Sequence, residues 1–379
     1  AYVEQPLIDK TEIELRQEAI GELNDHVITR EELREYLNPI YDLERLITRV
    51  TYRTANPRDL IAFKNSISML PPIKSLLDEF DGALLKNIQN DIDAMEELCS
   101  LVDRSIMEEP PISVREGGLI KEGYNEDVDK YRNAKTEGKT WLAELEAKER
   151  EKTGIKNLKI KYNKVFGYYL EVTNSYKDLV PDYFTRKQTL ANAERYITPE
   201  LKELEDMILG AEDKLVSLEY DLFCEVRNKI AEEVVRIQRT AKAIANLDVF
   251  VSLAVVADQN NYCRPKMTNS GVIDIKGGRH PVVEKMITND MFIDNDTYLD
   301  NGNNRIAIIT GPNMAGKSTY MRQAALIVLM AQIGSFVPAT SAKIGIVDRI
   351  FTRVGASDDL ASGQSTFMVE MTEVANILH

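Results

Sequence analysis

The chain has 379 residues, a net charge of −14 and 28% charged residues. This length is typical of two or three domains with sizeable cores. An acidic chain of this kind is a poor general binder of nucleic acid, so any such ligand requires a local basic patch. Three distant cysteines (Cys99, Cys224 and Cys263) without metal-ligand spacing predict free thiols in a reducing cytoplasm. The longest uncharged stretch, 323–342, contains glycine and proline, which favours a buried helix and loop over a membrane span.

The first 110 residues are predicted to be helical, because apolar residues recur at helical spacing. Residues 29–32 (Thr-Arg-Glu-Glu) have the pattern of a capping box. Asn56 followed by Pro57 predicts a helix start, and Pro71 with Pro72 the end of that helix. No catalytic group stands out here, so this part is predicted to be scaffold.

Two long helices are predicted on either side of a short insertion. Residues 128–152 are highly charged with a thin apolar stripe, which is typical of a long, largely exposed helix. A second helix is predicted to start at Thr198-Pro199. Its apolar residues follow at steps of three or four from Leu215 to Ile244, and few helix breakers interrupt the run, so the helix is expected to extend past Asn246. Such a pair indicates two levers that carry a small domain at their tip.

The insertion, residues 153–196, changes to a two-residue period. Residues 158–162 and 167–172 are predicted to be strands. From residue 152 to 195 there are nine Lys or Arg against four acids, a net charge of +5. A solvated sheet face is one interpretation of this charge. Its position at the end of two long helices favours contact with a phosphate backbone, without base readout.

The last third combines strands and loops. Residues 272–275, 277–284 and 291–293 are predicted to join one sheet with a buried strand at 306–309. His280 is expected to be a core histidine. Phe292 is either a core residue or, because it precedes a glycine-rich loop, an aromatic that stacks on a nucleobase.

Residues 305–333 have the pattern of a strand, a phosphate-binding loop and a helix that stops before Gly334. Gly311 and Gly316 would let successive N–H groups point at phosphate oxygens, and the helix N-terminus would add its positive end. Lys317 would reach the β- and γ-phosphates, and the Ser318 hydroxyl would be a ligand of Mg²⁺. The alternative is a glycine turn that binds nothing.

Several motifs together resemble the bacterial MutS family of mismatch-recognition ATPases, over essentially the whole chain. They are residues 4–9, 167–172, 186–196, 278–284, 311–319 and 348–368. The resemblance implies a multidomain fold: a mostly α-helical lever and core domain with a small β-rich clamp insertion, followed by an incomplete α/β P-loop NTPase domain of the ABC type. The expected boundaries are 1–152 for the first part of the core, 153–200 for the clamp, 201–261 for the returning lever helix and 262–379 for the ATPase part.

The resemblance also implies roles for individual residues. Asn313, near the γ-phosphate, and Lys317 would be catalytic, Phe292 would stack on adenine, and Ser365 would reach the nucleotide of a dimer partner. The expected nucleotide-binding set is Phe292, Gly311, Pro312, Asn313, Met314, Ala315, Gly316, Lys317, Ser318, Thr319 and Ser365, with Ser318 on Mg²⁺. The expected DNA contacts are Lys159, Lys161, Arg186, Lys187, Asn192 and Arg195.

The implied function is a cytoplasmic, nucleoid-associated mismatch repair ATPase that uses ATP and Mg²⁺. Its expected partners are mismatched or looped duplex DNA, a second copy of itself and MutL-type repair factors, with no membrane. The family's mismatch-reading Phe-x-Glu element and Walker B acids are not found in the expected places, so we expect an internal fragment whose own hydrolysis is uncertain. Two alternatives stay open: a MutS-related clamp with a recombination or structural role, and a P-loop small-molecule kinase with a helical insertion.

Overall fold

A computed structural model describes residues 2–288, 290–312 and 315–352, together with Met371, Val374, Ala375 and Ile377. The chain divides into two compact units. The first comprises residues 1–39, 69–93 and 239–379, and the second comprises residues 40–68 and 94–238.

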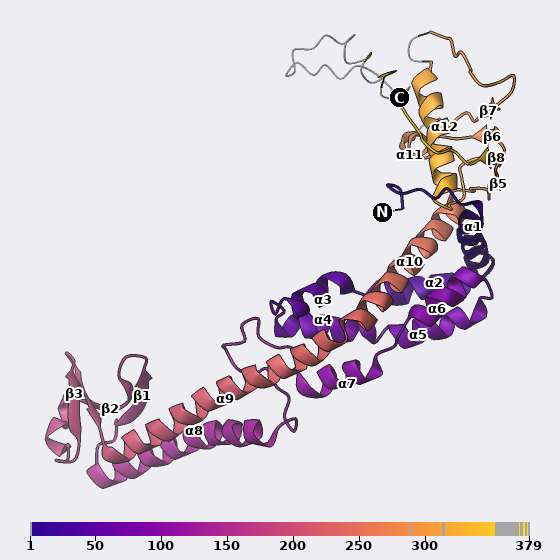
Figure 1. Ribbon diagram of the computed structural model, residues 1–379. Helices are drawn as coiled ribbons and strands as arrows, with labels where there is room; N and C mark the ends of the chain where they lie inside the picture. The colour runs from indigo at the N-terminus through magenta and orange to yellow at the C-terminus, as the bar shows by residue number, and fades with distance from the viewer. Residues whose placement is uncertain are drawn as a thin grey trace. The chain divides into compact units, whose positions relative to one another are not determined.

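The first unit combines a helical layer with a small sheet (Figure 1). Its helices are α1 (Lys10–Asp25), α2 (Val27–Leu37), α5 (Leu70–Leu76), the 3-10 turn η1 (Leu77–Glu79), α6 (Ala83–Asp91), α11 (Val283–Met286), α12 (Lys317–Gln332) and most of α10 (Val234–Gln259). Asp9 starts α1, since its carboxylate accepts hydrogen bonds from the N–H groups of Thr11 and Glu12.

The sheet of this unit has four strands in the order β5-β8-β6-β7. They are β5 (Lys266–Thr268), β8 (Ser341–Gly345), β6 (Ile273–Gly278) and β7 (Asn295–Leu299). β5 and β8 are parallel and the other pairs are antiparallel. Ile275 and Ile344 of the sheet, Ile327 of α12 and Ile13 of α1 share one core, so the sheet, α12 and α1 form a single packed body.

The second unit is built on two long helices (Figure 1). α8 (Glu126–Thr153) and α9 (Pro199–Glu232) pack along each other, and α3 (Leu43–Thr51), α4 (Pro57–Ile67) and α7 (Glu96–Ser105) cover the other part of α9 or pack on one another. The helix start predicted at Asn56 and Pro57 is confirmed, because Asn56 and Asp59 form a capping box there. The predicted long helix from Pro199 is confirmed as α9 followed by α10, with a single-residue interruption at Glu233.

The insertion between α8 and α9 is an antiparallel sheet in the order β1-β2-β4-β3. Its strands are β1 (Lys159–Asn163), β2 (Gly167–Thr173), β3 (Thr185–Thr189) and β4 (Ala193–Ile197), with the 3-10 segment η2 (Asn174–Leu179) after β2. Leu170, Val172 and Tyr196 point from one sheet face into a core with Leu145 of α8 and Ile208 of α9. The two strands predicted in this insertion are therefore confirmed.

The buried strand predicted at residues 306–309 is wrong. These residues form no strand, and the side chains of Ile306 and Ile308 are 85% and 88% exposed. Pairing rather than intrinsic preference decides whether an extended segment becomes a strand. No strand in the described part of the chain pairs with this run, which follows a turn in which Asp300 accepts the N–H groups of Gly302 and Asn304.

Three local predictions are also corrected. Residues 291–293 are not a strand, because β7 begins two residues later, at Asn295. Thr29 lies inside α2 and donates its hydroxyl to Glu79, so it caps no helix start. Pro71 and Pro72 occupy the first turn of α5, where their missing N–H groups need no partner, instead of ending α4.

One described helix, α10, is long and apolar enough to span a membrane. In its most apolar window 56% is buried inside the protein, as in a core helix.

Candidate functional site

The start of α12 has the geometry of an anion-binding loop. Gly316 precedes the helix with φ 85°, a left-handed conformation that a residue with a side chain rarely adopts. Among the residues that the structure describes, no side chain caps this start, so the first-turn N–H groups and the positive end of the helix dipole are available to an anion. This start can hold a phosphate group.

Lys317 lies over this loop. Its Nζ donates a hydrogen bond to the carbonyl oxygen of Pro312 at 3.2 Å and a second one to the carbonyl oxygen of Gly311. The exposed hydroxyl-bearing residue Ser318 follows in the first turn, and Thr319 is half-buried. The ammonium group therefore stands at the same end of the helix as the first-turn N–H groups, and both favour a negatively charged ligand.

The remaining predicted nucleotide residues are only partly described. Gly311, Pro312 and Ala315 are exposed in the loop, and Phe292 is half-buried in the segment that leads into β7. Asn313, Met314 and Ser365 lie outside the described residues.

The hydroxyl of Tyr320, which the sequence did not indicate as functional, connects the start of α12 to β7, the strand that follows Phe292. Tyr320, three residues after Lys317, accepts a hydrogen bond from the Thr297 hydroxyl at 2.9 Å and donates one to the Asp296 carbonyl oxygen at 3.0 Å. Both partners belong to β7. No local pattern around Tyr320 could have revealed this link, because its partners lie more than twenty residues away.

His280 is buried, 6% exposed, as predicted for a core histidine. Its Nδ1 accepts hydrogen bonds from the N–H groups of Val282 and Val283, both at 3.2 Å, and so starts the short helix α11. Burial lowers the pKa of His280 below its ordinary value, and the nearby cation Arg322 lowers it further. The neutral ring thus carries its proton on Nε2.

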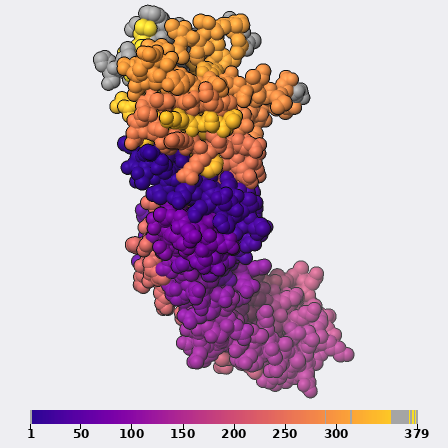
Figure 2. Space-filling model, turned by 90° about the vertical axis from the view of Figure 1, so that its right-hand side faces the viewer, coloured from indigo at the N-terminus to yellow at the C-terminus, as the bar shows by residue number. Residues whose placement is uncertain are grey.

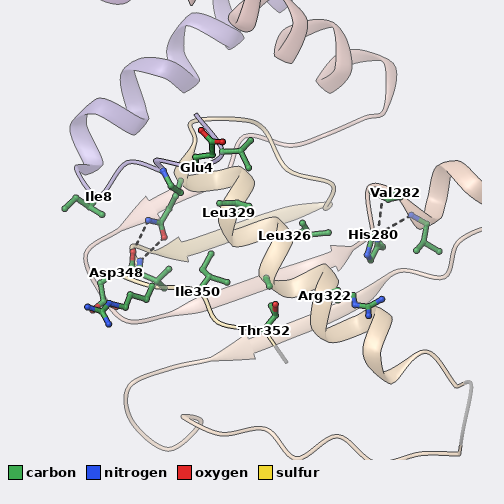
Figure 3. Close-up of a pocket in the computed structure, with 17 residues that line it drawn as sticks. Glu4, Ile8, His280, Val282, Arg322, Leu326, Leu329, Asp348, Ile350 and Thr352 are labelled. Atoms are coloured by element: carbon green, nitrogen blue, oxygen red, sulfur yellow. Dashed lines mark hydrogen bonds between the residues drawn. The ribbon is translucent and has the colours of Figure 1, made fainter. Parts of the chain in front are cut away.

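A cavity of about 790 Å³ lies beside α12, lined by the N-terminal segment, α12 itself and residues 347–352. Figure 3 shows Leu326 and Leu329 of α12 beside it, with His280 and Ile350 on neighbouring segments. Figure 2 shows the indigo N-terminal residues directly against the orange and yellow residues of the C-terminal third. The lining consists mainly of apolar side chains and includes none of the described phosphate-loop residues, so this cavity is not the predicted nucleotide site.

The predicted DNA contacts lie in the four-stranded sheet β1-β2-β4-β3 of the insertion, which we call the clamp sheet. The strand register aligns Lys159 with Glu171 and Glu171 with Arg195, so these side chains share the open face that also carries Lys161. We call Lys159, Lys161 and Arg195 the basic sheet face. Arg186 instead aligns with Tyr196, whose side chain points into the core.

Glu171 lies at the centre of the basic sheet face. Its Oε1 is 2.7 Å from Lys161 Nζ, and its Oε2 is 4.0 Å from Arg195 Nε. The Arg195 guanidinium also stacks over the Tyr169 ring at 4.4 Å. The hydrogen bond to Glu171 raises the pKa of Lys161, so the lysine stays charged. The two-residue period of β2 could have revealed this carboxylate among the cations.

Arg186 has a carboxylate partner of its own. Glu194, only 2% exposed, lies 3.5 Å from Arg186 and 3.1 Å from Lys177, and accepts the hydroxyl of Tyr196. The hydrogen bond from Tyr196 and the two cations lower the pKa of Glu194, and burial together with this carboxylate raises the pKa of Tyr196 to about 12.

The two other predicted contacts lie at irregular positions of the sheet. Lys187 is exposed at the β-bulge between Arg186 and Gln188. Asn192 is exposed in the turn between β3 and β4, and its carbonyl oxygen accepts the N–H of Asn174. Neither side chain lies on the basic sheet face.

Comparison with known proteins gives matches along most of the chain. Residues 1–254 match the family model described as MutS domain III, and residues 307–379 match MutS domain V. Proteins named DNA mismatch repair protein MutS are 72% identical in Lachnoclostridium phytofermentans, 61% in Ruminiclostridium cellulolyticum and 59% in Caldanaerobacter subterraneus, each over the full chain. The chain spans 41–43% of the length of these relatives. With a domain III match over two thirds of its length and a domain V match at its C-terminal end, this chain belongs to the MutS family.

Proposed function

We propose that this chain is the lever, clamp and partial ATPase region of a DNA mismatch repair protein. In the whole protein it would bind duplex DNA as a dimeric clamp and couple ATP binding and hydrolysis to the state of that clamp. The observation that carries the proposal is the start of α12, which no described side chain caps and over which Lys317 lies, in a chain 72% identical over its length to a protein named for DNA mismatch repair. The names of the relatives favour repair over a recombination clamp or a small-molecule kinase.

The proposed nucleotide site runs from Gly311 to Thr319. The N–H groups of the loop and of the first turn of α12 would surround the phosphates, and Lys317 would leave its loop carbonyls to bind them. Mg²⁺ would neutralise phosphate charge, and the exposed Ser318 hydroxyl would be one of its ligands. Phe292 would stack on adenine. Asn313, near the γ-phosphate, and Ser365, from a partner subunit, are proposed on family resemblance alone.

The proposed DNA site is the clamp sheet. The basic sheet face, together with Arg186, Lys187 and Asn192, would contact phosphates without reading bases. Family resemblance also supports a homodimer and partners of the MutL type, and the free, half-buried cysteines agree with a cytoplasmic location.

Binding of Mg·ATP, measured by calorimetry with Lys317→Ala, tests the nucleotide site. We expect the substitution to weaken binding at least tenfold, because a hydrogen bond from a charged group contributes roughly 1.5–3 kcal/mol. Lys285→Ala, at an exposed lysine on α11, is the matched control and should leave the Kd unchanged. Equal affinities of Lys317→Ala and the wild type would contradict the proposed site.

A further inference from the structure

Tyr320 joins the phosphate loop to the strand that follows Phe292. It lies in the first turn of α12, and its half-buried side chain places the hydroxyl between the side chain of Thr297 and the carbonyl oxygen of Asp296. Thr297 is 6% exposed, so its hydroxyl has little access to water as an alternative partner. The Tyr320 hydroxyl thus donates and accepts at once, which fixes its direction.

β7 is held independently on its other side. It is an edge strand, paired only with β6 among the described strands, and the pairing is irregular between Ile275 and Gly278. The Asp296 carboxylate accepts the N–H of Gly277 at 2.9 Å within this irregularity, and that hydrogen bond lowers the pKa of Asp296. Asp296 is therefore bound to the sheet through its side chain and to Tyr320 through its carbonyl oxygen.

The hydrogen bond between Tyr320 and Asp296 joins two segments that are each close in sequence to a predicted nucleotide-binding residue. Phe292 precedes Asp296 by four residues, and Lys317 precedes Tyr320 by three. A segment of four residues extends at most about 14 Å. Tethering Asp296 to Tyr320 accordingly limits how far Phe292 can move from the phosphate loop (Figure 1, β7 and α12).

We propose that Tyr320 is a positioning residue of the nucleotide site: its hydroxyl sets the distance between the base-stacking segment at Phe292 and the phosphate-binding loop at Lys317. This role rests on the proposed nucleotide function and deepens it. Tyr320 touches no nucleotide atom in this role. It acts through β7, so that a ligand with both a base and phosphates can engage both segments without first ordering them.

Comparing ATP with a ligand that has phosphates but no base distinguishes a positioning role of Tyr320 from a general effect on folding, because only ATP uses the segment at Phe292. Tyr320→Phe keeps the ring and removes both hydrogen bonds. We expect it to weaken ATP and ADP binding about fivefold to tenfold, while the Kd of inorganic tripolyphosphate, which uses only the loop, stays within about twofold of the wild-type value. Tyr298→Phe, on the same strand and half exposed, is the matched control and should change neither Kd.

Thr297→Val provides a second route to the same hydrogen bond, in case Tyr320→Phe disturbs folding. It should weaken ATP binding in the same selective way, and the double substitution should weaken it by less than the product of the single effects. Equal weakening of ATP and tripolyphosphate, or unchanged ATP binding by Tyr320→Phe, would overturn the proposal. A wild-type chain that binds neither ligand would contradict the nucleotide site itself, and this role with it.

Discussion

His280 shows how a single buried residue makes the stability of this chain depend on pH. Its ring accepts two N–H groups through Nδ1, so protonation of that atom would break both hydrogen bonds. Burial is the largest cause that lowers its pKa and Arg322 adds to it, whereas a backbone hydrogen bond and Glu284 act in the opposite direction. The folded protein therefore binds this proton less readily than the unfolded chain does.

The sign of the resulting pH dependence follows from linkage. The stabilisation is present above the ordinary pKa of about 6.5 and is lost as pH falls through the lower folded value. We expect the free energy of unfolding, measured with urea, to decrease from pH 7 to pH 5 in the wild-type protein. The decrease should be smaller in His280→Asn, because asparagine keeps a hydrogen-bond acceptor but does not titrate. His26→Asn, at an exposed histidine, is the matched control. An unchanged slope in His280→Asn would contradict this account.

At the scale of elements, three glutamates of the long helices hold the clamp sheet. Glu205 of α9 accepts the N–H of Tyr168 at 2.6 Å, and Glu146 of α8 accepts the N–H of Ile160 at 2.8 Å. Glu149 of α8 accepts the hydroxyl of Tyr183 at 2.7 Å. Because these bonds meet β1, β2 and the segment before β3, the sheet is fixed to the helices at several points in addition to its apolar core.

Gly167 is the tightest point of this joint. Its φ is 76°, and a Cβ atom there would lie 2.2 Å from Glu205 Oε2. We expect Gly167→Ala to lower the free energy of unfolding by about 1–3 kcal/mol, because alanine is strained in the left-handed conformation and its Cβ would displace the Glu205 carboxylate. Faster hydrogen exchange at the Tyr168 amide would localise the effect.

The matched control for this prediction is Gly210→Ala, in α9 with open space around it. It should be neutral or stabilising by up to about 1 kcal/mol, since alanine favours a helix more than glycine does. A Gly167→Ala protein as stable as the wild type would show that the joint adapts without strain.

The elements also show what sequence periodicity can and cannot predict here. α8 and α9 are long and amphipathic, and their own residues determine them, so both were predictable. The predictions for Thr29 and for residues 306–309 were wrong because their state depends on partners that local sequence does not reveal: Glu79, fifty residues away, and neighbouring strands. In the candidate site, the loop residues follow from a motif, whereas the Tyr320 link depends on tertiary contacts between α12 and β7.

At the scale of the whole molecule, charge is unevenly distributed. The chain carries −14 overall, yet residues 152–195 carry nine cations against four acids. Two of those acids, Glu171 and Glu194, contact Lys161, Arg195, Arg186 or Lys177 directly. The cations available to a phosphate backbone are therefore fewer than the number of basic residues indicates, and the acidic remainder of the chain repels the same ligand.

Removing the carboxylate at the centre of the basic sheet face should therefore strengthen DNA binding. We expect Glu171→Gln to raise the affinity for a duplex, because Lys161 and Arg195 lose their competing partner, and Lys161→Ala to lower it. Each phosphate contact changes the slope of log K against log salt by about 0.9. The slope should therefore become steeper in Glu171→Gln, which gains phosphate contacts, and shallower in Lys161→Ala, which loses one. Fluorescence anisotropy over a salt series, with paired and mismatched duplexes, measures both the affinity and the slope.

Because these phosphate interactions carry no base information, the two duplexes should respond equally to each substitution. Glu203→Gln on α9 and Lys242→Ala on α10 are controls of matched charge at exposed positions outside the sheet. Weaker binding by Glu171→Gln would contradict the prediction, since it would mean that this carboxylate orients Lys161 and Arg195 toward DNA rather than competing with it. Stronger binding with a steeper salt slope would identify the basic sheet face as a phosphate-binding surface on which Glu171 competes with DNA for Lys161 and Arg195.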